Sequence, residues 1–147
     1  MAVAQEHWAA KWVHSREGHV PQDAFRYHDK AIARAHFKGG LHIGYVSHER
    51  HGCVIGWGGE EHCLPEYEVL SGDQNQFRWV KCSGKVRPQF FIPLKAGHEA
   101  DHNLELYIAK IHHHIGKAGQ HLEGGASYAH NGREETAYEY EVLAFLG

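Results

Sequence analysis

Long hydrophobic runs, an excess of one charge and paired cysteines are all missing from this chain of 147 residues. No apolar run approaches the roughly 18 to 20 residues that a membrane-spanning helix needs, so membrane insertion is not expected. Fifteen Lys and Arg residues against 18 Asp and Glu give a net charge of −3 with no basic stripe, which argues against a nucleic-acid partner. The three cysteines form no CxxC pair and predict free thiols.

The chain has neither a recognisable export signal in its first residues nor a common catalytic motif. Residues 1–7 contain neither a basic nor an apolar signal region, so we expect a cytoplasmic protein, with release by a non-classical route as the alternative. The chain has no Gly-x-Ser-x-Gly elbow, no Gly-Lys-Ser/Thr phosphate loop and no His-Glu-x-x-His helix. We therefore expect neither catalysis nor a cofactor.

Histidine is abundant, with 16 residues, and raises the question of metal binding. His112 with His114, and His48 with His51, have spacings that could chelate Zn²⁺ or Ni²⁺. No spacing repeats a closed set of four ligands, so the preferred interpretation is surface histidines and no obligatory metal. A histidine-based metal-binding module stays open as an alternative.

A repeat of about 70 residues runs through nearly the whole chain. Residues 67–70 (Tyr-Glu-Val-Leu) recur as residues 140–143, an offset of 73 that also carries Gly59 onto Gly132. Upstream, Trp12-Val13 matches Trp79-Val80 with a slightly different offset, which indicates loop insertions and deletions. The repeat predicts a single domain, residues 1–147, built of two copies at about 8–72 and 73–147.

The pattern inside each copy is that of short strands separated by turns. Residues 138–142 alternate apolar and acidic side chains, and glycine pairs such as Gly58-Gly59 and Gly124-Gly125 supply the positive φ of tight hairpins. No stretch longer than ten residues has a helical period, although the Trp8 and Trp12 pair indicates a single helical turn. The predicted class is all-β, with two tandem pseudo-symmetric repeats of short antiparallel strands sharing one core.

These segments resemble the DM-nine repeat family. In the first copy the resemblance lies in residues 32–35 (Ile-Ala-Arg-Ala), 58–62 (Gly-Gly-Glu-Glu-His) and 67–70. In the second copy it lies in the less close segments 108–110, 115–117, 132–135 and 140–143. Two-repeat members of this family include invertebrate mannose-specific lectins that act as homodimers in innate recognition of pathogens, and the resemblance implies that fold and function here.

The resemblance also implies where a sugar would bind. Lectin members hold it with an acidic residue and a lysine, because a carboxylate accepts hydroxyl hydrogen bonds and an ammonium donates them. The matching positions are Glu99 and Lys117 in the second copy, and Asp29 and Tyr45 in the first. Since Tyr45 replaces the lysine, the second copy is expected to keep the family's site and the first to have an altered one.

The sequence therefore predicts a carbohydrate-binding lectin for mannose or mannose-containing glycans, acting in microbial glycan recognition or agglutination. Cross-linking of glycans needs at least two sites per particle, so we expect either a homodimer, which the family resemblance favours, or two sites per chain. The alternative is a non-catalytic protein-interaction or histidine-based metal-binding module on the same fold.

Overall fold

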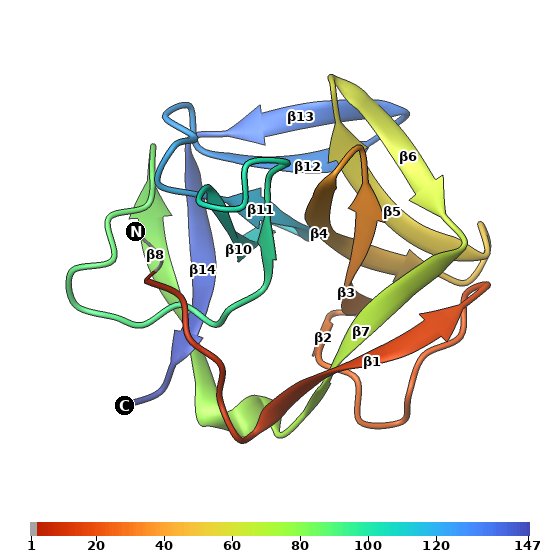
Figure 1. The fold of residues 1–147 in the computed structure, drawn as a ribbon, viewed down its shortest axis with the longest axis horizontal. Helices are drawn as coiled ribbons and strands as arrows, with labels where there is room; N and C mark the ends of the chain where they lie inside the picture. Colours follow the sequence, from red (N-terminus) through yellow and green to blue (C-terminus); the bar gives the residue numbers. More distant parts are fainter. Residues whose placement is uncertain (1–2) are drawn as a thin grey trace.

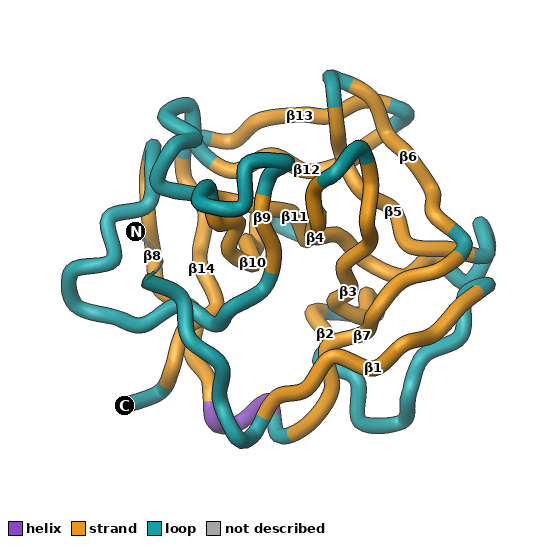
Figure 2. Tube along the Cα trace, viewed as in Figure 1, coloured by secondary structure: helices purple, strands orange, loops and turns teal. Residues whose placement is uncertain are grey.

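The computed structural model describes residues 3–147, and almost all of its regular structure is β-strand (Figures 1 and 2). The first half contains β1 (Ala10–Arg16), β2 (Arg26–Tyr27), β3 (Lys30–Phe37), β4 (Gly40–Ser47), β5 (Gly52–Trp57), β6 (Glu60–Leu64) and β7 (Glu66–Gly72). A short 3-10 helix, η1 (Gln74–Gln76), leads to the second half. That half contains β8 (Phe77–Ser83), β9 (Gly97–His98), β10 (Glu105–Ile111), β11 (His114–Ala118), β12 (Ala126–His130), β13 (Arg133–Ala137) and β14 (Glu139–Phe145).

The order of the strands in the sheet is nearly a palindrome. It runs β1-β7-β3-β4-β5-β6-β13-β12-β11-β10-β14-β8, with β2 beside β3, and β9 beside both β10 and β4. The first six strands are thus followed by their counterparts in reverse order, and the two halves meet where β6 pairs with β13. In Figure 1 the first half, coloured red to yellow-green, lies beside the second half, coloured green to blue. The all-β prediction is confirmed.

The strand register fixes which residues of the two halves correspond on β4 and β11. Ile32 on β3 is opposite Tyr45 on β4, and Ile108 on β10 is opposite Lys117 on β11. Tyr45 and Lys117 therefore occupy equivalent positions.

The same argument relates the two acidic residues. Tyr27 pairs with Lys30, and Gly97 pairs with Leu106, which is the counterpart of Lys30. Asp29 and Glu99 each follow two residues after these paired positions, so they are equivalent as well. The loop after Glu99 is longer than the tight turn that contains Asp29, so the surroundings of the two acidic residues differ in shape.

The halves share a hydrophobic core. Its buried residues come in equivalent pairs, among them Ile32 with Ile108 and Leu70 with Leu143, and the partly buried Trp12 and Trp79 pack against it. Each half also has a cluster of its own, around Val69 in the first and Val142 in the second. Burial of large apolar side chains of this kind stabilises the fold by roughly 1.5–3 kcal/mol each.

The helical turn predicted around Trp8 and Trp12 is wrong. Residues 10–16 form β1, and Trp12 pairs with Leu70 across the sheet. The two tryptophans, four residues apart, do not share one face of a helix: Trp8 is 81% exposed, whereas Trp12 packs on the shared core. Within residues 3–147 no helix is long and apolar enough to cross a bilayer.

Gly44 and its counterpart Gly116 allow neighbouring strands to approach closely. A Cβ on Gly44 would fall on the carbonyl oxygen of Val54, and one on Gly116 on that of Ser127. Because backbone atoms cannot move aside as a flexible side chain can, these positions admit only glycine. Gly44 thereby sets the distance between β4 and β5 next to Tyr45.

We expect Gly44→Ala to lower the free energy of unfolding by about 3 kcal/mol or more, because the methyl group pushes β5 away from β4. The matched control is Gly124→Ala, where the nearest heavy atom to a new Cβ is a Thr136 methyl at 3.7 Å. Urea denaturation followed by tryptophan fluorescence measures both. Equal midpoints for the two variants would contradict the close approach.

Candidate functional site

The first half has a polar pocket of about 520 Å³ that contains both sugar-site residues predicted for it. Asp29 comes from the turn between β2 and β3, where His28 takes a left-handed conformation with φ of 56°. Tyr45 comes from β4, and Lys30 from the start of β3. The structure thus brings Asp29 and Tyr45 to one pocket.

Lys30 supplies this pocket with a positive charge. Its Nζ lies 5.4 Å from the centre of the Tyr45 ring, a cation–π contact. Burial raises the pKa of the Tyr45 phenol, and the nearby Glu61 carboxylate acts in the same direction, so the phenol stays protonated and can donate a hydrogen bond. An acid, an ammonium and a phenol ring therefore line the same cavity.

Lys117, the equivalent of Tyr45, is engaged differently. Its side chain is almost fully buried and reaches across to the first half. The Nζ donates to the carbonyl oxygen of Gly56 at 2.7 Å and lies 2.9 Å from Nδ1 of His42 and 3.7 Å from Oε2 of Glu134. The ammonium of Lys117 is thus surrounded by acceptors from the protein itself.

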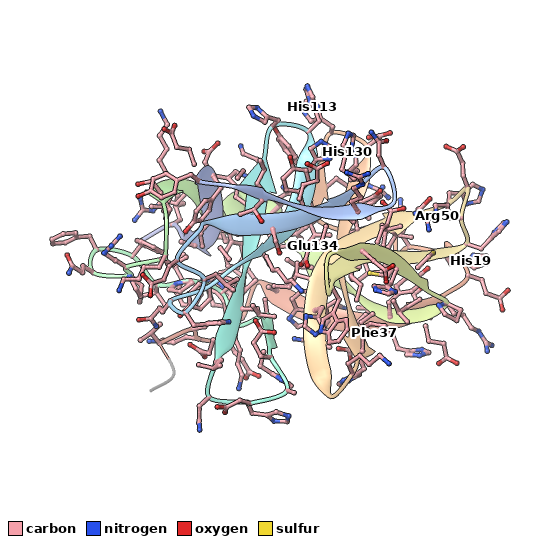
Figure 3. All side chains as sticks on the ribbon, turned by 90° about the horizontal axis from the view of Figure 1, so that it is seen from above. His19, Phe37, Arg50, His113, His130 and Glu134 are labelled. Carbon is pink, nitrogen blue, oxygen red and sulfur yellow. The ribbon has the colours of Figure 1, made fainter. Side chains whose placement is uncertain are left out.

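Glu134 completes this junction from β13. Its Oε1 accepts a hydrogen bond from the backbone N–H of Gly59, and its Oε2 accepts one from Ser127 Oγ at 2.9 Å. Figure 3 shows Glu134 near the centre of the view, between the strands of the two halves. The carboxylate thus accepts the backbone N–H of Gly59 from the other half and balances the positive charge of Lys117.

Burial is the main cause of the pKa shifts of Lys117 and His42 at this junction. It lowers the pKa of Lys117, while the Glu134 and Glu99 carboxylates oppose that effect. Burial and the neighbouring Lys117 charge also lower the pKa of His42 to about 4. His42 is therefore neutral at pH 7, and its Nδ1 is free of a proton when it accepts from Lys117.

Glu99 lies close to Lys117 without touching it. Its Oε2 is 2.7 Å from Nε2 of His121, and no hydrogen bond or ion pair joins Glu99 to Lys117 in the part of the chain that the structure describes. The two residues predicted for the second copy thus share an electrostatic neighbourhood, but each has a histidine as its direct partner.

Two residues of these sites, Lys30 and His42, escaped the sequence argument. Lys30 directly follows Asp29, so a search for a cation next to the acid, rather than at the aligned lysine position, would have found it. His42 lies 75 residues from Lys117 in the sequence and carries no local signal for their contact.

The histidines do not gather into a metal cluster in residues 3–147. No group of three or more His, Cys, Asp or Glu side chains is placed to hold an ion there. His28 and His113 form a pair across the two halves, with Nε2 of His28 and Nδ1 of His113 3.1 Å apart. His113 and His130 lie at the same edge of the molecule in Figure 3. Of the two pairs singled out by spacing, His48 and His51 have ring centres 6.4 Å apart.

Comparison with known proteins gives a family and a fold. The model of the DM9 repeat matches residues 27–121. No curated protein matches the chain. Among solved structures, the nematode sperm cell motility protein MFP2B superposes with a TM-score of 0.63 over 97% of this chain, at 12% identity. This chain spans 46% of that protein, and at such low identity the likeness shows the fold alone.

The buried His42 gives the protein an acid-dependent stability. In the unfolded chain its pKa is near 6.5, so lowering the pH from 6.5 to about 4 protonates the unfolded state first, and the free energy of unfolding falls. The loss from this one group is up to about 3 kcal/mol. We expect His42→Asn, whose amide oxygen can still accept from Lys117, to reduce this pH dependence.

Urea denaturation at pH 7 and pH 4 measures the effect. His36→Asn, at an exposed histidine of β3, is the control and should keep the pH dependence of the unmodified protein. If His42→Asn and His36→Asn behave alike, the buried imidazole is not the cause.

Proposed function

The chain belongs to the DM9 repeat family, and from this premise we propose that it is a carbohydrate-binding lectin for mannose-type sugars that acts without catalysis. The observation that carries the proposal is the pocket of Asp29, Lys30 and Tyr45. Its volume of about 520 Å³ falls within the usual range for small-ligand sites. The carboxylate accepts hydrogen bonds from sugar hydroxyls, the ammonium donates to them, and the phenol ring packs on the apolar face of a pyranose.

We place the working site in the first half. Asp29 is exposed and Lys30 lines the cavity, whereas the Lys117 ammonium has protein acceptors and is buried. Lys30 thus replaces the lysine that the family has at the position of Tyr45. In the second half, Lys117 holds the two halves together. The sequence favoured the second copy, and the buried contacts of Lys117 are the reason for preferring the first.

We expect methyl α-mannoside to bind with a dissociation constant of about millimolar to tens of micromolar. Asp29→Asn should weaken binding at least about tenfold, because a charged acceptor of sugar hydroxyls is lost. Isothermal titration calorimetry measures the affinity, and a glycan array of the untagged protein measures the sugar class.

The same carboxylate-to-amide change at the equivalent position, Glu99→Gln, is the matched control, and Asp23→Asn tests an exposed acid outside the pocket. Both should bind as the unmodified protein does. Loss in Glu99→Gln alone would move the site to the second half, and an array with no signal would rule out the lectin.

The lectin is proposed to act as a homodimer in agglutination of microbial glycans. With one working pocket per chain, cross-linking requires a second copy. The chain offers large exposed apolar side chains that suit an interface, notably Trp8 at 81% and Phe90 at 91% exposure.

Sedimentation should therefore give twice the chain mass of 16.7 kDa, and mannose-coated beads should be agglutinated. Trp8→Ser and Phe90→Ser remove apolar area without touching the pocket. At least one of them should yield monomers that still bind methyl α-mannoside but no longer agglutinate. Agglutination by a monomer of 16.7 kDa would contradict this arrangement.

The second candidate function is a protein-interaction module. It is favoured by the fold shared with MFP2B, which is described as a sperm cell motility protein. A histidine-based metal-binding module has as its main support the His28 and His113 pair. Thermal unfolding separates these functions, since a ligand that binds the folded state raises the melting temperature: mannose protects a lectin, and Zn²⁺ protects a metal module until a chelator is added.

A further inference from the structure

The second half contains a cation held between two aromatic rings. The Nζ of Lys110 lies 4.7 Å from the centre of the Tyr27 ring and 5.0 Å from that of Trp79. Glu141 pairs with the same ammonium at 3.4 Å, and the Tyr27 hydroxyl donates to the carbonyl oxygen of His112. The phenol of Tyr27 thus fills a place beside Lys110, although it comes from the first half.

The first half repeats this arrangement with one ring missing. Arg34 is equivalent to Lys110, because Arg34 pairs with Glu68 on β7 as Lys110 pairs with Glu141 on β14. Its guanidinium lies 4.1 Å from the centre of the Trp12 ring, and Trp12 is the counterpart of Trp79.

The counterpart of Tyr27 is Gly97, which has no side chain to cover the cation. A side chain could not be accommodated there either, since a Cβ on Gly97 would fall on the carbonyl oxygen of Leu41. The longer hairpin of β3 and β4 has brought its backbone against β9, where Leu41 pairs with His98.

A pocket of about 450 Å³ lies at this place, lined among others by Trp12, Arg34 and Gly97. Its walls are fixed. Arg34 donates from Nε to Glu68 at 2.8 Å and from Nη1 to the Ala96 carbonyl at 2.7 Å, and the Trp12 indole donates to the Lys95 carbonyl at 3.3 Å. Preorganised walls reduce the conformational entropy that the protein loses when a ligand binds.

We propose that this pocket binds a phenolic ring, supplied by a small phenol or by a tyrosine side chain of another protein. The π face of the ring stacks with Arg34, since a planar guanidinium packs well on aromatic faces. Glu6 and Glu105 line the pocket and supply acceptors for the ring hydroxyl. Since Oε1 of Glu105 already accepts from the backbone N–H groups of Val3 and Ala4, the acceptor is the Glu6 carboxylate or Oε2 of Glu105. This site is separate from the pocket of Asp29 and Tyr45 and does not depend on sugar binding there.

The test uses the indole N–H signals of the four tryptophans in a ¹⁵N-labelled sample. Trp12→Phe assigns the Trp12 signal. N-acetyl-L-tyrosinamide should shift the Trp12 signal in a saturable manner and leave that of Trp79, already covered by Tyr27, in place. N-acetyl-L-leucinamide, which lacks the ring, should shift neither. p-Cresol tests the free phenol: binding by both probes fits either source, and binding by p-cresol alone assigns the pocket to small phenols.

Matched variants test the cation. Arg34→Gln should weaken tyrosinamide or cresol binding by about 2- to 30-fold, the range of a cation–π contact. Lys110→Gln makes the equivalent change where Tyr27 already covers the cation and should leave the affinity unchanged. The spectra of both variants report that they are folded.

The reciprocal experiment removes the built-in ring. In Tyr27→Ala the place beside Lys110 and Trp79 becomes open, and p-cresol should now shift the Trp79 signal as well. A shift of Trp79 in Tyr27→Ala without any shift of Trp12 would overturn the proposal, because it would show that the probe works and the Arg34 pocket does not bind it. A saturable shift of Trp12 by methyl α-mannoside but not by the phenols would also overturn it.

Discussion

A buried ammonium at the junction of the two halves is the constraint on which the rest of the structure depends. A charge removed from water is strongly unfavourable unless acceptors surround it. Lys117 finds its acceptors mainly in the opposite half, in the Gly56 carbonyl and the neutral imidazole of His42, and the Glu134 carboxylate lies 3.7 Å away. Because Glu134 also binds the Gly59 turn, the junction of β6 and β13 is held by side chains as well as by the shared core.

The same constraint explains why two similar halves have different sites. Where the second half has Lys117, the first has Tyr45, whose ring packs partly on the core and needs no countercharge. The charge in the first half comes from Lys30 instead, which lines the cavity and contacts the Tyr45 ring. One copy of the repeat thus uses its cation to join the two halves, and the other has its polar groups at the wall of a cavity.

The fold could be predicted from sequence because its signals are local. Alternation in residues 138–142 indicates strands, and the recurrence of residues 67–70 as 140–143 indicates two copies of the same set. The aligned positions of Tyr45 and Lys117 are equivalent in the strand register. The environment of Lys117 could not be predicted in this way. Its partner His42 lies 75 residues away on the other half. A contact between the two halves produces no periodic pattern in the sequence of either copy. The spacing of Trp8 and Trp12 misled for the opposite reason, since a local period can arise by chance.

Internal duplication also makes each half a reference for the other. Where equivalent residues differ, the change in volume or charge must be absorbed nearby, because protein interiors are close-packed. The exchange of Tyr27 for Gly97 is absorbed only in part by the approach of β4, and a pocket is left beside the Arg34 and Trp12 pair. Where Tyr45 stands in place of Lys117, Lys30 supplies the positive charge that the tyrosine lacks. In the first exchange the smaller residue, Gly97, belongs to the second half, and the pocket opens beside Arg34 and Trp12 of the first half. In the second exchange the pocket of Tyr45 lies within the first half, so both cavities lie where the two copies differ.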